Sequence, residues 1–288
     1  MQTERGRTSH RREVGAGARS RWLTAPLGTV AAMQWGLSLS LAGELADPAV
    51  VADVAVGAEA AGWDGVFVWD HLWNRTLVPF ADPWVTLAAV AVATERVRLG
   101  PLVTPLPRRR PQVVAQQATT LDRLSAGRLT LGLGLGHDGY GEYSAFDEPL
   151  TDDRARAAAL DAGIELLLPA LAGEPVPQAG DRWTTAAGAQ HPRCPIWVAG
   201  RVDRVAGPRR AVRHGLEGIA VVGGGHWKPQ HVAEALAAAD RRPGQLEIVL
   251  VGGTHPDPAA LGEAGATWCI DEVMPGATAA DARRVAAR

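Results

Sequence analysis

Residues 97–135, VRLGPLVTPLPRRRPQVVAQQATTLDRLSAGRLTLGLGL, contain a complete strand–helix–strand unit. Val97–Val103 and Leu129–Leu135 are short apolar runs typical of β-strands. The amphipathic segment Pro111–Leu124 lies between them and starts with a proline, which loses no hydrogen bond at the first helical position. A strand, a helix and a second strand in succession predict parallel pairing with a right-handed crossover. The unit therefore indicates an α/β protein built on a parallel sheet.

The same alternation runs from Gln34 to the C-terminus. The segments typical of strands are Gln34–Ser40, Gly65–Asp70, Val97–Val103, Leu129–Leu135, Pro195–Gly200, Gly218–Gly223, Glu247–Gly252 and Ala266–Glu272. The segments typical of helices are Pro48–Ala61, Pro83–Thr94, Pro111–Leu124, Asp153–Leu171, Arg204–His214, Pro229–Ala239, Pro256–Glu263 and Thr278–Ala287. The sequence thus predicts eight strands, each followed by a helix.

Eight such units after residue 32 match the length of about 250 residues that is typical of a closed barrel. The alternative is a doubly wound open sheet, which favours a glycine-rich phosphate loop after the first strand. Ser38–Gly43 (SLSLAG) has no GxGxxG pattern there. We therefore predict an α/β fold, a single (β/α)8 TIM barrel with a parallel eight-stranded core, over residues 33–288.

The first 32 residues differ from the rest of the chain. They carry more arginines than acidic residues, separated by glycine and serine, with no apolar period. Such a segment buries too little surface to offset its ordering entropy, so we expect a disordered arm. Met33 directly precedes the first strand, which raises the hypothesis that the arm lies upstream of the true start. An arginine-rich transit peptide is the alternative.

The bulk composition is that of a soluble globular protein, with 47% hydrophobic residues, 21% charged residues and a formal net charge of −2. This balance gives no reason to expect nucleic acid or a membrane as partner. Cys194 and Cys269 are the two cysteines, and they form no CxxC motif. We therefore expect neither a disulfide framework nor a thiolate metal site, and a cytoplasmic location.

Polar residues gather where the predicted strands end, and in a barrel these ends share one mouth. Each strand contributes some of them: Ser38 and Ser40, Asp70 and His71, Val103 and Thr104, Gly136 to Asp138, Gly200 and Arg201, Gly223 to His226, Gly252 to His255, and Asp271 and Glu272. The sequence therefore predicts a functional site at this mouth.

Four blocks of the chain resemble the luciferase-like family of flavin- or deazaflavin-dependent monooxygenases and oxidoreductases. They are residues 58–72 (AEAAGWDGVFVWDHL), residues 94–111 with 116–133, residues 134–146 (GLGHDGYGEYSAF), and residues 192–200 (PRCPIWVAG) with 210–218. Taken singly none is specific, but their order and spacing together are. The resemblance implies a cofactor, coenzyme F420 or FMN, and a homodimer.

The resemblance also implies where the cofactor binds. It places a bulge, often with a non-proline cis peptide, against the ring at Gly100, Leu102, Val103 and Thr104. It gives Gly134 and Gly136 the role of leaving room for the ring, and Gly200 and Arg201 the role of contacting the cofactor phosphate. Many relatives have glycine where this chain has Arg201. The arginine would therefore either strengthen the binding of the cofactor phosphate or displace the phosphate from this position.

Asp70 and His71 form the predicted catalytic pair. The histidine can exchange a proton beside the ring, while the carboxylate either orients it or turns inward as a structural acceptor. Trp69 and Trp73 are predicted apolar walls, and His137 and Glu142 predicted substrate contacts. Arg108–Arg110 is interpreted as a solvated face or a dimer contact.

The predicted function is hydride transfer to or from, or monooxygenation of, a small organic substrate. One alternative is a metal-dependent barrel hydrolase that uses His71, His137, His226 and His255 with Asp70 or Asp271. The first strand has no HxH pair, which counts against this alternative, and we therefore predict no metal ligands. A barrel that binds flavin without turnover is the other alternative.

Overall fold

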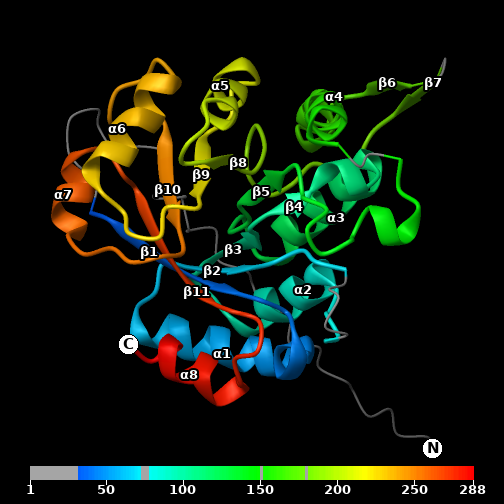
Figure 1. The fold of residues 1–288 in the computed structure, drawn as a ribbon. Helices are drawn as coiled ribbons and strands as arrows, with labels where there is room; N and C mark the ends of the chain where they lie inside the picture. The colour runs from blue at the N-terminus through cyan, green and yellow to red at the C-terminus, as the bar shows by residue number, and fades with distance from the viewer. Residues whose placement is uncertain (1–31, 73–77, 150–151, 179–180) are drawn as a thin grey trace, which may run out of the picture.

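The computed structural model describes residues 32–72, 78–149, 152–178 and 181–288. Within them, one parallel sheet has the strand order β3-β2-β1-β11-β10-β9-β8-β5-β4 (Figure 1). Its two end strands, β3 (Arg98–Pro101) and β4 (Thr104–Pro105), are separated by only two residues, so the sheet closes on itself; β3 lies within the predicted strand Val97–Val103 and β4 directly follows it. The predicted (β/α)8 barrel is confirmed, with its third strand interrupted after Pro101. Apart from Ala32, the predicted N-terminal arm lies outside the described residues.

Every predicted strand and helix is present, with ends shifted by a few residues at most. The other barrel strands are β1 (Gln34–Leu39), β2 (Gly65–Val68), β5 (Leu131–Gly134), β8 (Ile196–Arg201), β9 (Gly218–Val222), β10 (Glu247–Val251) and β11 (Trp268–Val273). The helices are α1 (Pro48–Ala61), α2 (Pro83–Ala93), α3 (Pro111–Leu124), α4 (Asp153–Leu171), α5 (Ala206–Arg213), α6 (Pro229–Ala238), α7 (Pro258–Glu263) and α8 (Ala279–Ala286). The sequence did not predict the antiparallel pair β6 (Val176–Gln178) and β7 (Asp181–Trp183), because strands this short carry no readable alternation.

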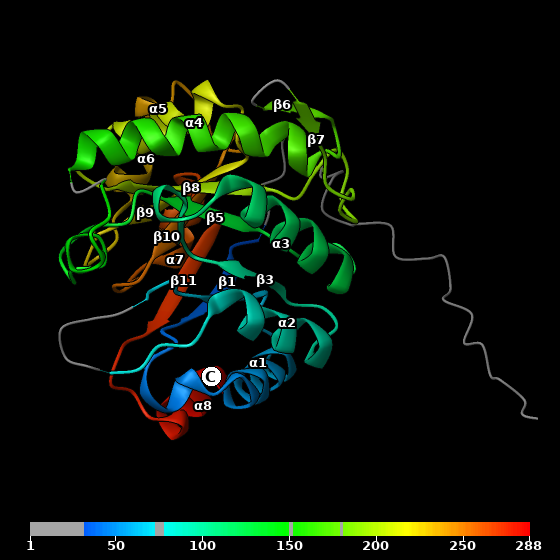
Figure 2. The same cartoon turned by 90° about the vertical axis from the view of Figure 1, so that its right-hand side faces the viewer.

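Local chemistry fixes where these helices begin and end. Asp82 caps α2 by accepting a hydrogen bond from the Val85 amide at 2.9 Å, and Pro83 occupies the first position of the helix. Gly62 ends α1 at its C-terminus with φ 99°, a left-handed conformation that glycine adopts at little cost. The resulting helices surround the sheet, as Figure 2 shows from a second side.

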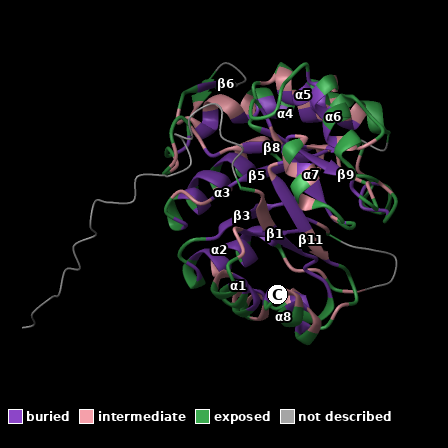
Figure 3. Cartoon of the chain, turned by 90° about the vertical axis from the view of Figure 1, so that its left-hand side faces the viewer, coloured by how far each residue is buried: buried purple, intermediate pink, exposed green. Residues whose placement is uncertain are grey.

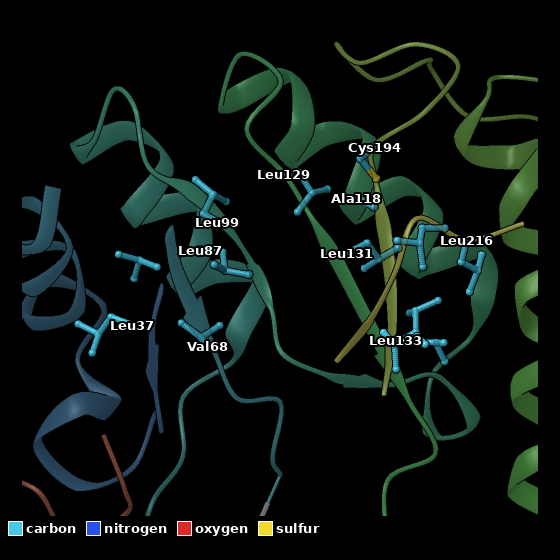
Figure 4. Close-up of a cluster of buried hydrophobic side chains, with 14 of the residues drawn as sticks. Leu37, Val68, Leu87, Leu99, Ala118, Leu129, Leu131, Leu133, Cys194 and Leu216 are labelled. Atoms are coloured by element: carbon cyan, nitrogen blue, oxygen red, sulfur yellow. The ribbon is translucent and has the colours of Figure 1, made fainter. Parts of the chain in front are cut away.

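The larger part of the core lies between the sheet and the helices. Figure 3 shows buried strands inside and exposed helix faces outside. Branched side chains on the outer face of the strands, such as Leu37, Leu99 and Leu131, have no exposed surface and pack towards helix residues such as Leu87 and Ala118 (Figure 4). This apolar layer holds the strand ends in place.

Aromatic side chains fill the inside of the barrel. Phe67, Trp197 and Trp268 are fully buried, and their ring centroids are 5.3 to 5.9 Å apart. The Trp197 indole donates to Glu247 Oε2 at 2.6 Å, which satisfies the donor as burial requires. Trp197 and Trp268 lie near the amino ends of their strands, so the open space is left at the carboxyl ends.

Candidate active site

A cavity of about 260 Å³ opens at the carboxyl ends of the barrel strands. Its walls come from the segment after β2, the interruption between β3 and β4, β4 itself, the loop after β5, and strands β9, β10 and β11. The lining residues are Trp69, Asp70, His71, Leu102, Val103, Pro105, Gly136, His137, Tyr140, Glu142, Ala220, Val222, Val251 and Glu272. We call this space the mouth cavity. It brings together eight of the predicted site residues, whereas the predicted wall Trp73 lies outside the described residues.

The interruption of the third strand forms one wall of the mouth cavity. The peptide bond between Leu102 and Val103 is cis, as the resemblance led us to expect for this segment. The Leu102 amide donates to the Val68 carbonyl at 2.8 Å, which ties the bulge to β2. A Cβ on Gly134 would lie 2.5 Å from Val103 Cγ2. Gly134 therefore leaves room for Val103, and Val103 faces the cavity.

The carboxylate of Asp70 points into a cluster of basic groups. Arg109 donates from Nε and Nη2 at 2.8 and 2.7 Å, and Thr104 Oγ1 donates at 2.8 Å. Arg108 Nη2 donates to the Asp70 backbone oxygen at 2.9 Å and lies 3.3 Å from Oδ1. Of the two roles considered for Asp70, the geometry matches the inward structural acceptor.

The interpretation of Arg108–Arg110 as a solvated or dimer-contact face is wrong for the first two residues. The side chain of Arg108 is 2% exposed and that of Arg109 is 18% exposed, and both pair with carboxylates of the site. A buried carboxylate needs such a cation nearby, because an unpaired buried charge is strongly destabilising. Only Arg110 remains exposed.

His71 has its own carboxylate partner, Glu142. The two side chains meet at 2.9 Å between Nδ1 and Oε2, and the Leu72 amide donates to the other oxygen of Glu142. Burial favours the neutral acid, but the hydrogen bond from His71, the charges of His71 and Arg108, and the Leu72 amide together lower the pKa of Glu142 from 4.5 to about 2. An ionised Glu142 accepts only, so Nδ1 of His71 carries a proton and Nε2 is left for a ligand.

The loop after β5 carries Glu142 over the cavity. Gly136 turns the chain with φ 65°, and a Cβ there would lie 2.8 Å from both Pro105 Cβ and the Tyr143 hydroxyl oxygen. Tyr143 donates to the Leu135 carbonyl at 2.9 Å, and Asp138 accepts from the Tyr143 amide. The loop also places Tyr140 with its ring centroid 5.4 Å from that of His71. Tyr140 was not among the predicted site residues.

Polar atoms without partners face the inside of the barrel. The hydroxyls of Ser38 and Ser40 are buried and have no hydrogen-bond partner among the described residues. Glu272 of β11, which is in register with Ser38 of β1, lines the mouth cavity. Buried polar groups are usually paired, so unpaired ones beside a cavity-lining strand could be completed by a ligand group. Apolar walls with a few such groups fit a flat heteroaromatic ring that has polar edges.

Gly200 and Arg201 lie outside the mouth cavity. They line a second groove of about 360 Å³ between α5 and α6. Gly200 packs closely against Gly207 of α5, where a Cβ would lie 3.1 Å from the Gly207 Cα. Arg201 is 65% exposed and donates to Asp203 at 2.9 and 3.2 Å. The structure thus separates the predicted phosphate contacts from the predicted ring contacts.

The histidines named for a metal site do not gather at one point. His71 and His137 line the mouth cavity, while His226 bonds Thr254 at 2.6 Å. His255 lies beside Trp35 and 3.6 Å from Asp271. Over the described part of the chain, no group of His, Cys, Asp or Glu is arranged to hold a metal ion. None of the helices described there is long and apolar enough to span a bilayer.

A profile of the family described as luciferase-like monooxygenase matches residues 27–270. The chain belongs to this family. The F420-dependent glucose-6-phosphate dehydrogenase of Beutenbergia cavernae is 35% identical over 230 residues, which make up 73% of this chain and 66% of that relative. The match therefore spans slightly less than two thirds of that relative.

Solved structures confirm the barrel. The coenzyme F420-dependent tetrahydromethanopterin reductase of Methanopyrus kandleri superposes with a TM-score of 0.67 at 14% identity, over 88% of this chain and 97% of that one. The FMN complex of the oxygenating constituent of 3,6-diketocamphane monooxygenase from Pseudomonas putida superposes with a TM-score of 0.58 at 17% identity, over 76% and 67%. At these identities the likeness shows the shared barrel fold.

Proposed function

We propose that this chain is an oxidoreductase that binds a deazaflavin or flavin ring in the mouth cavity and acts on a small organic substrate. The observation that carries the proposal is His71, held by the ionised Glu142 on the wall of a cavity that also contains the Leu102–Val103 bulge. Coenzyme F420 is the proposed cofactor, and FMN is the alternative.

The residues of the cavity fit such a ring. Leu102 and Val103 would support one of its faces, and the hydroxyls of Ser38 and Ser40 would pair with its polar edge. A bound deazaflavin or flavin supplies the two-electron exchange with the substrate, and the protein supplies position and proton transfer.

His71 is the proposed catalytic residue. Its Nε2 accepts a proton from a substrate hydroxyl, or returns one in the reverse direction, while Nδ1 donates to Glu142. The negative charge of Glu142 stabilises the imidazolium that forms when Nε2 takes up the proton. Asp70 acts on His71 only indirectly. It holds Arg108 in position, and Nη1 of Arg108 lies 3.0 Å from Oε2 of Glu142, the partner of His71. Asp70 is therefore proposed as a positioning residue.

The charge at the end of β8 favours F420 over FMN. Arg201 and Arg204 share the single carboxylate of Asp203, at 2.9 and 3.7 Å, so the rim of the barrel keeps a positive charge there. F420 carries a long anionic tail, which such a rim attracts more strongly than the short tail of FMN. The name of the Beutenbergia relative supports the same choice.

A cofactor titration tests the proposal. The purified protein is titrated separately with F420, FMN and riboflavin, and binding is followed by the change in fluorescence of each compound. We expect saturation at one cofactor per chain, with F420 binding more tightly than FMN. Stoichiometric zinc with no uptake of any of the three compounds would contradict the proposal and favour the hydrolase. Tight binding without turnover of any alcohol, aldehyde or ketone would favour a non-catalytic flavin carrier.

We further propose a cytoplasmic homodimer. Val85 and Val92 of α2 are 64% and 70% exposed, and Val113 and Leu124 of α3 are also exposed apolar residues. An apolar face of this kind is typical of a protein interface. Light scattering of the parent chain and of Val92→Glu tests this, because the substitution should shift a dimer towards the monomer. Cys194 and Cys269 are buried free thiols, which suits a reducing compartment.

A further inference from the structure

The basic side chains at the mouth cavity are already neutralised by carboxylates. Arg109 is paired with Asp70, and Arg108 lies between Asp70 and Glu142. Among the described residues that line the cavity, neither a lysine nor an arginine is present. Among these described residues a phosphoryl group that entered the cavity would meet no unpaired lysine or arginine, and burying such a group without a cation is costly.

Glu272 adds an acidic group to the cavity wall. No hydrogen bond or ion pair joins its carboxyl to any described residue, and burial raises its pKa above the ordinary range. A Cβ on the neighbouring Gly252 would lie 1.9 Å from Glu272 Oε2, so this glycine leaves the space that the carboxyl occupies. The other titratable side chains of the lining are Asp70, His71, His137, Tyr140 and Glu142.

We propose that Glu272 determines the substrate specificity of the mouth cavity: it selects an uncharged substrate that bears a hydroxyl or carbonyl oxygen, and it rejects phosphorylated substrates. This inference rests on the proposed oxidoreductase function. The Glu272 carboxyl donates a hydrogen bond to such an oxygen when it is protonated, and accepts one from a hydroxyl when it is ionised. A phosphate would instead face a group that becomes negative when it ionises, and such a like-charge contact is a means of rejecting the wrong ligand.

The surrounding walls agree with an uncharged substrate. Ala220, Val222 and Val251 flank Glu272 on β9 and β10, and the bulge adds Leu102 and Val103. The positive charge near the mouth lies instead on the rim at Arg201 and Arg204, which line the separate groove. The chain therefore differs in substrate class from the relative that is named for glucose 6-phosphate.

The test uses the full chain loaded with whichever cofactor it binds, and glucose 6-phosphate as the probe. Binding is measured by calorimetry and turnover by the absorbance of the cofactor. We expect the parent chain to show neither saturable binding nor turnover of millimolar glucose 6-phosphate. We expect Glu272→Lys to bind the probe at least about tenfold more tightly than the parent chain. The matched control Glu263→Lys, an exposed position of α7, should leave its affinity unchanged.

Each outcome decides the proposal. Turnover of glucose 6-phosphate by the parent chain would overturn it, and so would equal affinities in Glu272→Lys and Glu263→Lys. If Glu272→Lys does not fold, as judged by circular dichroism, Glu272→Gln replaces it. That variant should bind the probe more tightly than the parent chain, and an unchanged affinity again overturns the inference. A parent chain that binds no cofactor at all would overturn the proposed function, which is a separate result.

Discussion

Arg109 donates two hydrogen bonds to Asp70, one to each carboxylate oxygen, at 2.8 and 2.7 Å. Asp70, which precedes His71 in the sequence, therefore pairs with an arginine and not with His71. The carboxylate that bonds His71 is that of Glu142, 71 residues further along the chain. The Asp70–Arg109 ion pair and the His71–Glu142 hydrogen bond thus link the segment after β2 to the segment after β4 and to the loop after β5. The site depends on all three segments being in place.

Asp70→Asn should destabilise the fold. The Asp70 side chain has no exposed surface, so its loss leaves buried guanidinium charge without its partner. Breaking such a pair costs about 3–5 kcal/mol. Urea unfolding at pH 7 measures the loss. The control is Asp53→Asn, which removes the solvent-exposed pair with Arg283 and should cost about 1 kcal/mol or less. Equal losses in the two variants would show that the buried network does not stabilise the fold.

Glu142 should make the free energy of unfolding depend on pH in the acidic range. Its pKa is lowered from 4.5 to about 2 on folding, so the stabilisation is complete above pH 4.5 and disappears as the pH falls towards 2. Glu142→Gln should therefore be less stable than the parent at pH 7, with a difference that shrinks between pH 4.5 and 2. Urea unfolding at several pH values measures this. The control Glu165→Gln, at an exposed position of α4, should show no such trend. A difference that stays constant with pH would disprove the linkage.

His71→Asn should lower kcat by about 10²- to 10⁴-fold, because it removes the group that exchanges the substrate proton. The affinity for the cofactor should stay close to that of the parent, since the bulge at Leu102 and Val103 is unchanged. Steady-state kinetics and the fluorescence titration separate the two effects. The control is His231→Asn, whose ring bonds the backbone at the start of α6. Full activity in His71→Asn would remove this residue from the mechanism.

Gly136→Ala and Gly57→Ala should have opposite effects. At Gly136 a Cβ meets Pro105 and Tyr143 at 2.8 Å, and the φ of 65° is unfavourable for alanine, so we expect a loss of about 1–3 kcal/mol. Gly57 lies inside α1 with nothing within 4 Å of its Cβ position. Alanine there should add about 0.5–1 kcal/mol through its higher helix propensity. Thermal unfolding of both variants checks the pair.

Arg201→Ala should weaken the binding of F420 but not that of riboflavin. The substitution leaves Asp203 with only Arg204 as a partner, so the rim of the barrel loses its positive charge. Riboflavin has no phosphate and should bind with unchanged affinity. The same titration measures both ligands at low salt, where the effect is largest. Equal losses for the two ligands would place Arg201 at the ring instead.

The sequence predicts the barrel well because its signals are local. Asp82 and Pro83 mark the start of a helix, and Gly62 marks the end of one, without reference to the rest of the chain. The bulge at Leu102 and Val103 was predicted from the family resemblance, since nothing local reveals a cis peptide.

The site was predicted less completely, because pairing between distant side chains leaves no pattern in a single sequence. Arg108 and Arg109 look like a solvated run until the structure brings Asp70 and Glu142 against them. Glu272 was noted only as one of the strand-end residues. Which of two neighbouring strand residues faces inwards depends on the register of the sheet, and Ser38 pairs with Glu272 on that inner side.

The aromatic filling formed by Phe67, Trp197 and Trp268 has a kinetic consequence. These side chains block the amino end of the barrel, so molecules arrive and depart through one opening. Whatever occupies the deepest position must arrive first and depart last. Two ligands that share the mouth cavity would then follow a compulsory order, and the upper one would slow the dissociation of the lower. A saturating second ligand would thus lengthen the residence time of the first, although it changes none of the contacts between the first ligand and the protein.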